Sequence, residues 1–182
     1  MKRFIPNLIT VATIAAIAFP MMAQAALSPH ETISQTIDEN KITITYGRPY
    51  TKKGNTGDVR KIWGALVPYG KVWRTGADQA TTLTTDQPLV FGDTTIEKGK
   101  YTLWTLPVED GVSKLVINKQ TGQWGTQYDE KQDLARVDLK KEALDDTVDQ
   151  FTIVIEKKDS GGGVLKLKWE KTQFSVPFTV KK

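Results

Sequence analysis

Polar and apolar residues alternate with a period of two over much of the chain, which is the pattern of strands buried on one face. The alternation is clearest at residues 42–46, 151–156, 165–169 and 174–180. Weaker examples lie between residues 89 and 118, where glycine-containing turns separate them. The pattern predicts roughly eight to ten short strands joined by tight turns.

Strands at this spacing predict an all-β fold, and a single antiparallel β-sandwich is the architecture that fits best. A jelly-roll-like arrangement or closure into a barrel fits the same pattern, because periodicity does not encode strand order. Helical patterns are confined to short turns at residues 58–63, 129–135 and 140–144. Pro177 lacks an amide donor, so we expect its strand to lie at a sheet edge.

The first 25 residues have the features of a secretory signal peptide. Lys2 and Arg3 precede an apolar stretch at residues 8–22, and residues 23–25, Ala-Gln-Ala, supply a small-x-small cleavage site. The stretch is shorter than the roughly 20 apolar residues that span a bilayer, so we expect no stable membrane span after cleavage. Because no cysteine is available for lipid attachment, we expect residues 26–182 to form one domain that is periplasmic or secreted.

The composition excludes several kinds of chemistry. The chain contains no Cys and one His, which excludes disulfides, thiolate nucleophiles and Cys/His zinc sites. The formal net charge of +4 falls to +2 once Lys2 and Arg3 are removed, and no nucleic-acid-binding motif is present. We therefore expect no nucleic-acid partner and no cofactor. The one histidine, His30, is expected in a solvated, mobile segment at the mature N-terminus.

A long irregular connection, residues 46–78, interrupts the alternation of polar and apolar positions. Between Arg48 and Arg74 it carries seven basic side chains and one acid, a formal charge of +6. The rest of the chain after residue 25 carries −4, so the positive charge is concentrated in this segment. The same segment also holds two of the five tryptophans, Trp63 and Trp73.

The motifs of this connection resemble a known family, the bacterial exported proteins grouped as domain of unknown function 2911. The resemblance rests on Tyr46-Gly47-Arg48-Pro49, Ile62-Trp63-Gly64, Val72-Trp73-Arg74-Thr75-Gly76-Ala77, Gly99-Lys100-Tyr101-Thr102-Leu103, Gln123-Trp124-Gly125, Trp169-Glu170-Lys171-Thr172 and Val176-Pro177. The chain departs from the pattern at Gln79, where the family more often has Glu. The resemblance implies export and a single domain, and it supplies no activity and no catalytic residues.

The connection also supplies the candidate ligand-binding residues. Guanidinium groups offer paired donors for a carboxylate or phosphate, and flat aromatic rings suit sugar rings. The candidates are Arg48, Tyr50, Tyr69, Trp73, Arg74 and Asp78. The alternative is structural: arginines that bond loop carbonyls, and a core that holds at least three of the five tryptophans.

These residues favour a non-enzymatic binding module for an anionic or sugar-like ligand or a partner protein. One alternative is a hydrolase that works through carboxylates, with Asp78, Glu97 and Glu170 as candidates, or through a Lys-activated nucleophile. Another is a purely structural envelope protein. The acids at residues 129–133 and 145–149 lack a calcium-loop pattern, so we expect no metal site.

Overall fold

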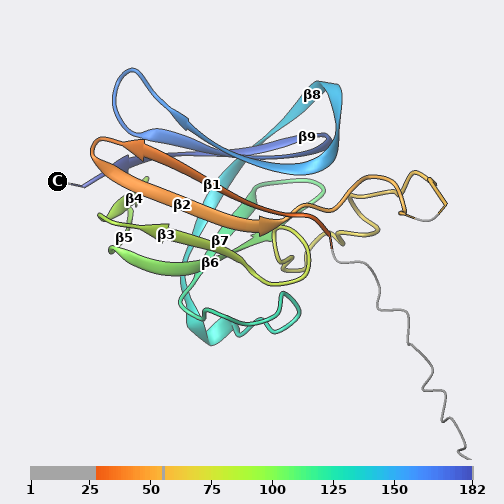
Figure 1. Cartoon of the computed structure of the whole chain (residues 1–182), viewed down its shortest axis with the longest axis horizontal. Helices are drawn as coiled ribbons and strands as arrows, with labels where there is room; N and C mark the ends of the chain where they lie inside the picture. Colours follow the sequence, from red (N-terminus) through yellow and green to blue (C-terminus); the bar gives the residue numbers. More distant parts are fainter. Residues whose placement is uncertain (1–27, 55, 182) are drawn as a thin grey trace, which may run out of the picture.

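The computed structural model describes residues 28–54 and 56–181, so the segment interpreted as a signal peptide lies outside the described residues (Figure 1). Within them, strands dominate and one short 3-10 helix, Glu130–Gln132, is present. The strands are β1 (His30–Ile37), β2 (Asn40–Gly47), β3 (Thr81–Thr85), β4 (Leu89–Phe91), β5 (Thr94–Ile96), β6 (Gly99–Leu106), β7 (Ser113–Asn118), β8 (Asp133–Lys157) and β9 (Gly163–Val180). Among the described residues, no helix has the length and apolar character needed to cross a membrane.

All nine strands belong to one antiparallel sheet in the order β1-β2-β3-β6-β7-β8-β9-β4-β5. The predicted all-β antiparallel fold is therefore confirmed, and the sheet does not close into a barrel. Two long strands let one sheet form both layers. The first part of β8 pairs with β7. The pairing of β8 with β9 shifts in register near Ala143 and again near Val148. From Thr152 onward, β8 pairs only with the start of β9.

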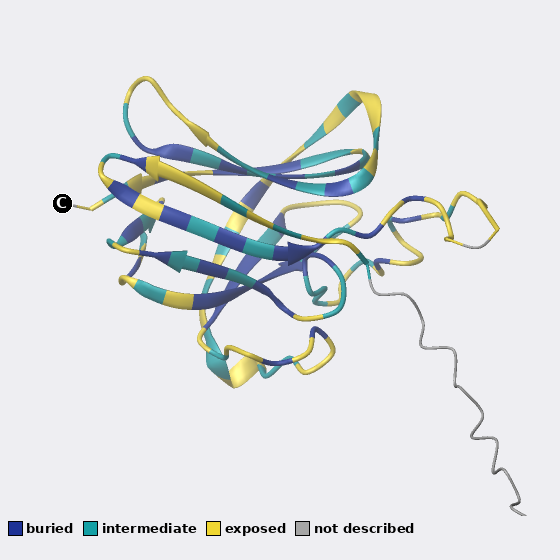
Figure 2. Cartoon of the chain, in the orientation of Figure 1, coloured by how far each residue is buried: buried dark blue, intermediate teal, exposed yellow. Residues whose placement is uncertain are grey.

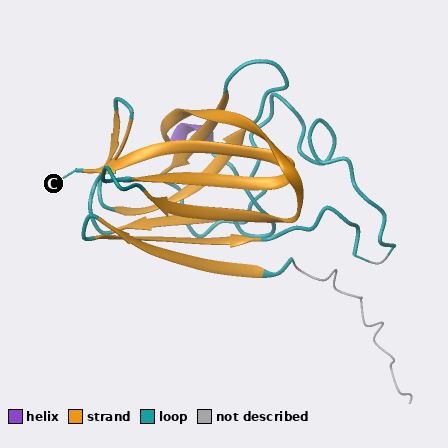
Figure 3. Cartoon of the chain, turned by 90° about the horizontal axis from the view of Figure 1, so that it is seen from above, coloured by secondary structure: helices purple, strands orange, loops and turns teal. Residues whose placement is uncertain are grey.

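The sheet folds over on itself at this bend, so that the β8–β9 hairpin crosses the inner face of β1, β2 and β3 (Figures 1 and 3). Along β2, Ile42, Ile44 and Tyr46 are buried while the threonines between them are partly exposed, as the banding in Figure 2 shows. Phe151 of β8 meets Tyr46 edge-on at 5.8 Å. Each such large apolar side chain contributes about 1.5–3 kcal/mol on burial, and their alternation explains why the period-two pattern was visible.

The outer face of the sheet is covered at β6 and β7 by the segment 119–132. Trp104 and Val116 are buried there, and the Trp104 ring lies 4.9 Å from that of Tyr128. Residues 101–105 are consequently buried on both faces. The rim of this covering segment forms one wall of the cleft described below.

Two local expectations were wrong. Residues 140–144, expected as a helical turn, belong to β8, because Lys140–Ala143 pair in register with Thr172–Ser175 of β9. Pro177 lies on β9, which is an interior strand in the sheet order. It is tolerated because the residues up to Ser175 pair with β8 and those from Thr179 pair with β4, so the proline falls between two partners.

Candidate functional site

Arg48 is tied into the fold by every nitrogen of its guanidinium group. Its Nε donates to the carbonyl of Phe151 at 3.1 Å, and its Nη2 donates to Thr152 Oγ1 at 2.9 Å. The third nitrogen, Nη1, lies 3.3 Å from Glu31 Oε2. Arg48 thus joins the end of β2 to β1 and β8, and it does not line either cleft described below.

Trp73 packs into the core with other aromatic rings. It stacks on Trp169 with centroids 5.7 Å apart and an interplanar angle of 15°, and it meets Trp63 and Phe151 edge-on. Four of the five tryptophans are buried or half-buried, and Trp124 is 38% exposed. The indole nitrogens of Trp63 and Trp169 are buried without a hydrogen-bond partner among the described residues. This cluster attaches the connection to β8 and β9.

The two candidate tyrosines have different contacts. Tyr50 is exposed and forms an isolated antiparallel bridge with Gln150 of β8. The ring of Tyr69 is half-buried, with the ammonium of Lys141 5.7 Å from its centroid. Desolvation raises the pKa of Tyr69 above its usual value.

Asp78 fastens the start of β1 to the end of the connection. Its Oδ2 accepts the amide of Ser28 at 2.9 Å and lies 3.2 Å from His30 Nε2. His30 is exposed, as expected, but it is the first residue of β1 rather than part of an irregular segment. The half-buried carboxylate of Asp78 therefore contacts both Ser28 and His30 at this end of the chain.

Arg74 lies beside Asp78 without an ion pair or hydrogen bond from its guanidinium group among the described residues. Both residues pack on Gly125: a Cβ there would lie 2.5 Å from Arg74 Cδ and 2.7 Å from the carbonyl oxygen of Asp78. The amide of Gly125 donates to that carbonyl at 2.8 Å. The absence of a side chain at residue 125 therefore lets segment 119–132 close against the connection.

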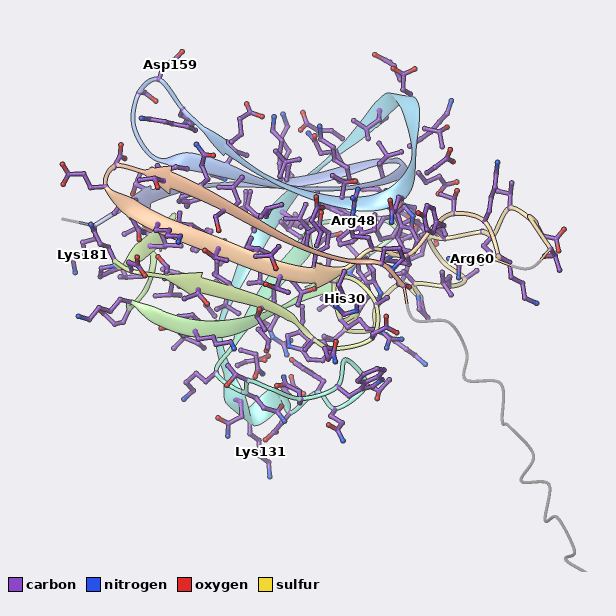
Figure 4. All side chains as sticks on the ribbon, in the orientation of Figure 1. His30, Arg48, Arg60, Lys131, Asp159 and Lys181 are labelled. Atoms are coloured by element: carbon purple, nitrogen blue, oxygen red, sulfur yellow. The ribbon has the colours of Figure 1, made fainter. Side chains whose placement is uncertain are left out.

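Next to Asp78 is a cleft of about 290 Å³ on the outer face of the sheet, which we call the outer cleft. Thr45 of β2 and Thr82 of β3 are register partners and lie on its floor, because their neighbours Tyr46 and Leu83 face the core. The lining residues are His30, Thr45, Tyr46, Gln79, Ala80, Thr82, Lys100, Gly122 and Gln123. Figure 4 places His30 at this end of the sheet, close to the base of the connection.

Gln123 is the most constrained polar side chain of the outer cleft. It is 8% exposed, and its Nε2 donates to Thr102 Oγ1 and to the carbonyl of Gln120, both at 3.3 Å. Its Oε1 is buried and has no hydrogen-bond partner among the described residues. Leaving such an acceptor unpaired costs roughly 1–3 kcal/mol, so a ligand donor that pairs with it when the side-chain amide turns toward the cleft would recover that free energy.

The candidate carboxylates are spread over the fold. Asp78 is bonded to His30, Glu97 lies exposed before β6, and Glu170 lies on β9. The acids near residue 130 are engaged by one guanidinium group: Arg136 pairs with Glu130 at 2.6 Å and with Asp133 at 2.8 Å. In the part of the chain that the structure describes, no three His, Asp or Glu side chains are placed to hold a metal ion.

Sequence reasoning missed the residues that line the outer cleft. Of the predicted candidates, Asp78 adjoins it through His30, and Arg74 lies beside Asp78 across Gly125. Gln79 was noted only as a departure from the family pattern, and Lys100 and Gln123 were not proposed as ligand contacts, because each is an ordinary polar residue whose significance depends on strand pairing. The motifs containing Lys100 and Gln123 entered only through the family resemblance.

One family model matches the chain over most of its length. The model described as "Protein of unknown function (DUF2911)" matches residues 28–178. The chain belongs to this family. The DUF2911 match begins two residues before His30 and ends within β9, so it includes every strand of the sheet and the whole outer cleft. Corresponding searches of curated proteins and of solved structures found no match.

Proposed function

We propose that this DUF2911 protein is an exported, non-enzymatic binding module that holds a small sugar-like ligand with an acidic group in the outer cleft. The observation that carries the proposal is the buried, unpaired Oε1 of Gln123, a residue that lines that cleft. An acceptor of this kind needs a donor, and the hydroxyls of a sugar supply donors. The export part rests on the features of residues 1–25.

The other lining groups complement such a ligand. Lys100 is exposed at the cleft and has no ion pair among the described residues, so its ammonium favours an acidic group on the ligand. The amide of Gln79 and the hydroxyl of Thr82 can each donate and accept hydrogen bonds. At about 290 Å³ the cleft is at the small end of ligand sites, which suits one ring rather than a chain of them.

The lining of the outer cleft favours binding over hydrolysis. A paired-carboxylate mechanism places two acids on either side of the bond that breaks. The described residues that line the outer cleft include neither Asp nor Glu, and the nearby Asp78 is already bonded to His30 and to the amide of Ser28.

The test is a titration of the protein, expressed from its full-length gene, with neutral monosaccharides and the matching uronic acids. We expect a uronic acid to bind more tightly than its neutral parent and to raise the unfolding temperature, since ligand at one hundred times Kd stabilises by about 2.7 kcal/mol. Lys100→Gln should remove the preference for the acid, and Gln79→Ala should weaken binding about tenfold.

Matched controls lie close by. Lys98→Gln changes an exposed lysine two residues away, and Gln35→Ala changes an exposed glutamine on β1, and neither residue lines the outer cleft. Both controls should bind like the parent protein. Equal loss of affinity in the controls and the cleft variants, or the absence of binding by any sugar or uronic acid, would reject the proposal.

A further inference from the structure

A second cleft, also about 290 Å³, lies where the connection meets the bend of the β8–β9 hairpin, and we call it the bend cleft. Figure 4 shows Arg60 here, at the base of the projecting loop and apart from His30. The lining residues are Thr51, Val59, Arg60, Thr147, Asp149, Glu170 and Lys171. None of them lines the outer cleft, so the two clefts are separate.

The bend cleft holds two cations and two carboxylates that are not paired with one another. Arg60 and Lys171 carry the positive charges, and Asp149 and Glu170 carry the negative ones. No ion pair within 4.0 Å involves any of these four among the described residues, although opposite charges elsewhere on the molecule do pair. The four charges are thus not neutralised by one another, although Asp149 Oδ1 accepts a hydrogen bond from Thr51 Oγ1 at 3.1 Å.

The guanidinium group of Arg60 makes one hydrogen bond to the protein among the described residues. Its Nη2 donates to the carbonyl of Tyr50, which fixes the guanidinium plane against the connection. Its Nε is buried and has no hydrogen-bond partner among the described residues. The remaining nitrogen, Nη1, makes no hydrogen bond among the described residues and is not among the buried unpaired atoms, so it can donate to a carboxylate in the cleft.

Glu170 occupies an unusual backbone position. Its φ is 55°, in the left-handed region that residues with a side chain rarely adopt. It lies at the register shift of the hairpin, paired with Val148 while the next paired position is Lys168 with Thr152. Backbone strain of this kind gathers at binding sites, where it presents a side chain that a regular strand would direct elsewhere.

We propose that the bend cleft binds a zwitterion of the α-amino-acid class. The α-carboxylate is received by Arg60 and Lys171, and the α-ammonium by Glu170 and Asp149. A simple anion would meet two carboxylates in this cleft, and a simple cation would meet a guanidinium and an ammonium. A ligand with both charges satisfies all four groups, and the cleft is small enough for a single amino acid.

The test uses the full-length protein and the twenty standard amino acids, each measured separately by calorimetry and by the shifts of backbone amide resonances. At least one should bind with saturation and shift the amides of Arg60, Thr147 and Lys171, leaving the Gln123 side-chain amide unchanged. Two analogues of the amino acid that binds are then compared with it: the amine that lacks the α-carboxylate and the carboxylic acid that lacks the α-ammonium. Each should bind at least tenfold more weakly than the amino acid.

Variants separate binding from folding. Arg60→Gln and Glu170→Gln should each reduce affinity about tenfold or more, while Lys53→Gln and Glu97→Gln, at exposed residues outside the bend cleft, should not. Glu170→Gly keeps the left-handed backbone accessible, so it should leave the protein folded and still abolish binding. The proposal is overturned if no amino acid binds, if singly charged analogues bind equally, or if Glu170→Gly binds like the parent.

Discussion

Two arginines of the connection should respond very differently to truncation. Arg48 uses its guanidinium group to hold β2 against β8, with hydrogen bonds to the Phe151 carbonyl and to Thr152 Oγ1. The guanidinium group of Arg74 makes no such bond among the described residues, and its aliphatic part packs against Gly125. Arg48→Ala should therefore destabilise the fold strongly, and Arg74→Ala only slightly.

The magnitude follows from the contacts that each substitution removes. A hydrogen bond from a charged donor contributes about 1.5–3 kcal/mol, and the side chain of Arg48 is 23% exposed, which places its two bonds toward the lower value. The pair with Glu31 adds less than about 1 kcal/mol because that carboxylate is well exposed. Arg48→Ala should thus lower the free energy of unfolding by about 3 kcal/mol, and Arg74→Ala by less than about 1 kcal/mol.

Urea unfolding followed by tryptophan fluorescence measures both changes, because the Trp63, Trp73 and Trp169 cluster reports on the contact between connection and hairpin. In a chain of this length, 3 kcal/mol corresponds to a fall of about 6–12 °C in the unfolding temperature. Unfolding of Arg48→Ala within about 2 °C of the parent protein, or equal destabilisation of Arg74→Ala and Arg48→Ala, would contradict these roles of the two arginines.

Gly125→Ala should destabilise by about 1–3 kcal/mol in the same assay, because its Cβ would lie 2.5 Å from Arg74 Cδ and 2.7 Å from the Asp78 carbonyl oxygen; an unchanged urea midpoint would contradict this close packing. Tyr46→Phe should cost about 1–3 kcal/mol, since the Tyr46 hydroxyl accepts the amide of Ile153 at 3.0 Å and that buried donor would lose its partner. Burial raises the pKa of Tyr46 to about 12, so the unfolded chain ionises first and stability should fall between pH 10 and 12. Tyr46→Phe should make that fall shallower in urea titrations, and equal slopes would argue against the buried hydroxyl.

Strands whose buried face is made of apolar residues were predictable from the sequence, and those without such a face were not; β3, whose buried positions include Thr81 and Thr85, was not predicted. In β2, the alternation of Ile42, Ile44 and Tyr46 with threonines follows directly from burial against the hairpin. In β8, residues 140–144 are mostly exposed, so they carry no apolar period. Their strand conformation comes from hydrogen bonding to β9, which lies some thirty residues further along the chain.

The candidate site also depends on contacts between residues that are far apart in the sequence. Arg48, Trp73 and Asp78 were chosen for their chemistry, yet Arg48 and Trp73 bond or pack within the fold. The outer cleft draws its lining from β1, β2, β3, β6 and the segment after β7, and strand order decides which of these meet. A polar residue such as Gln123 becomes informative only when its neighbours leave an acceptor unpaired.

If the outer cleft is a ligand site, its lining residue Gln123 must respond to the ligand. The side-chain amide resonance of Gln123 should be followed while the full-length protein is titrated with the uronic acids. We expect a saturable shift of this resonance, together with the amides of Gln79 and Thr82, because all three residues line the cleft and Gln123 Oε1 lacks a donor. Saturable binding that leaves these three resonances unmoved, or no binding by any uronic acid, would contradict it.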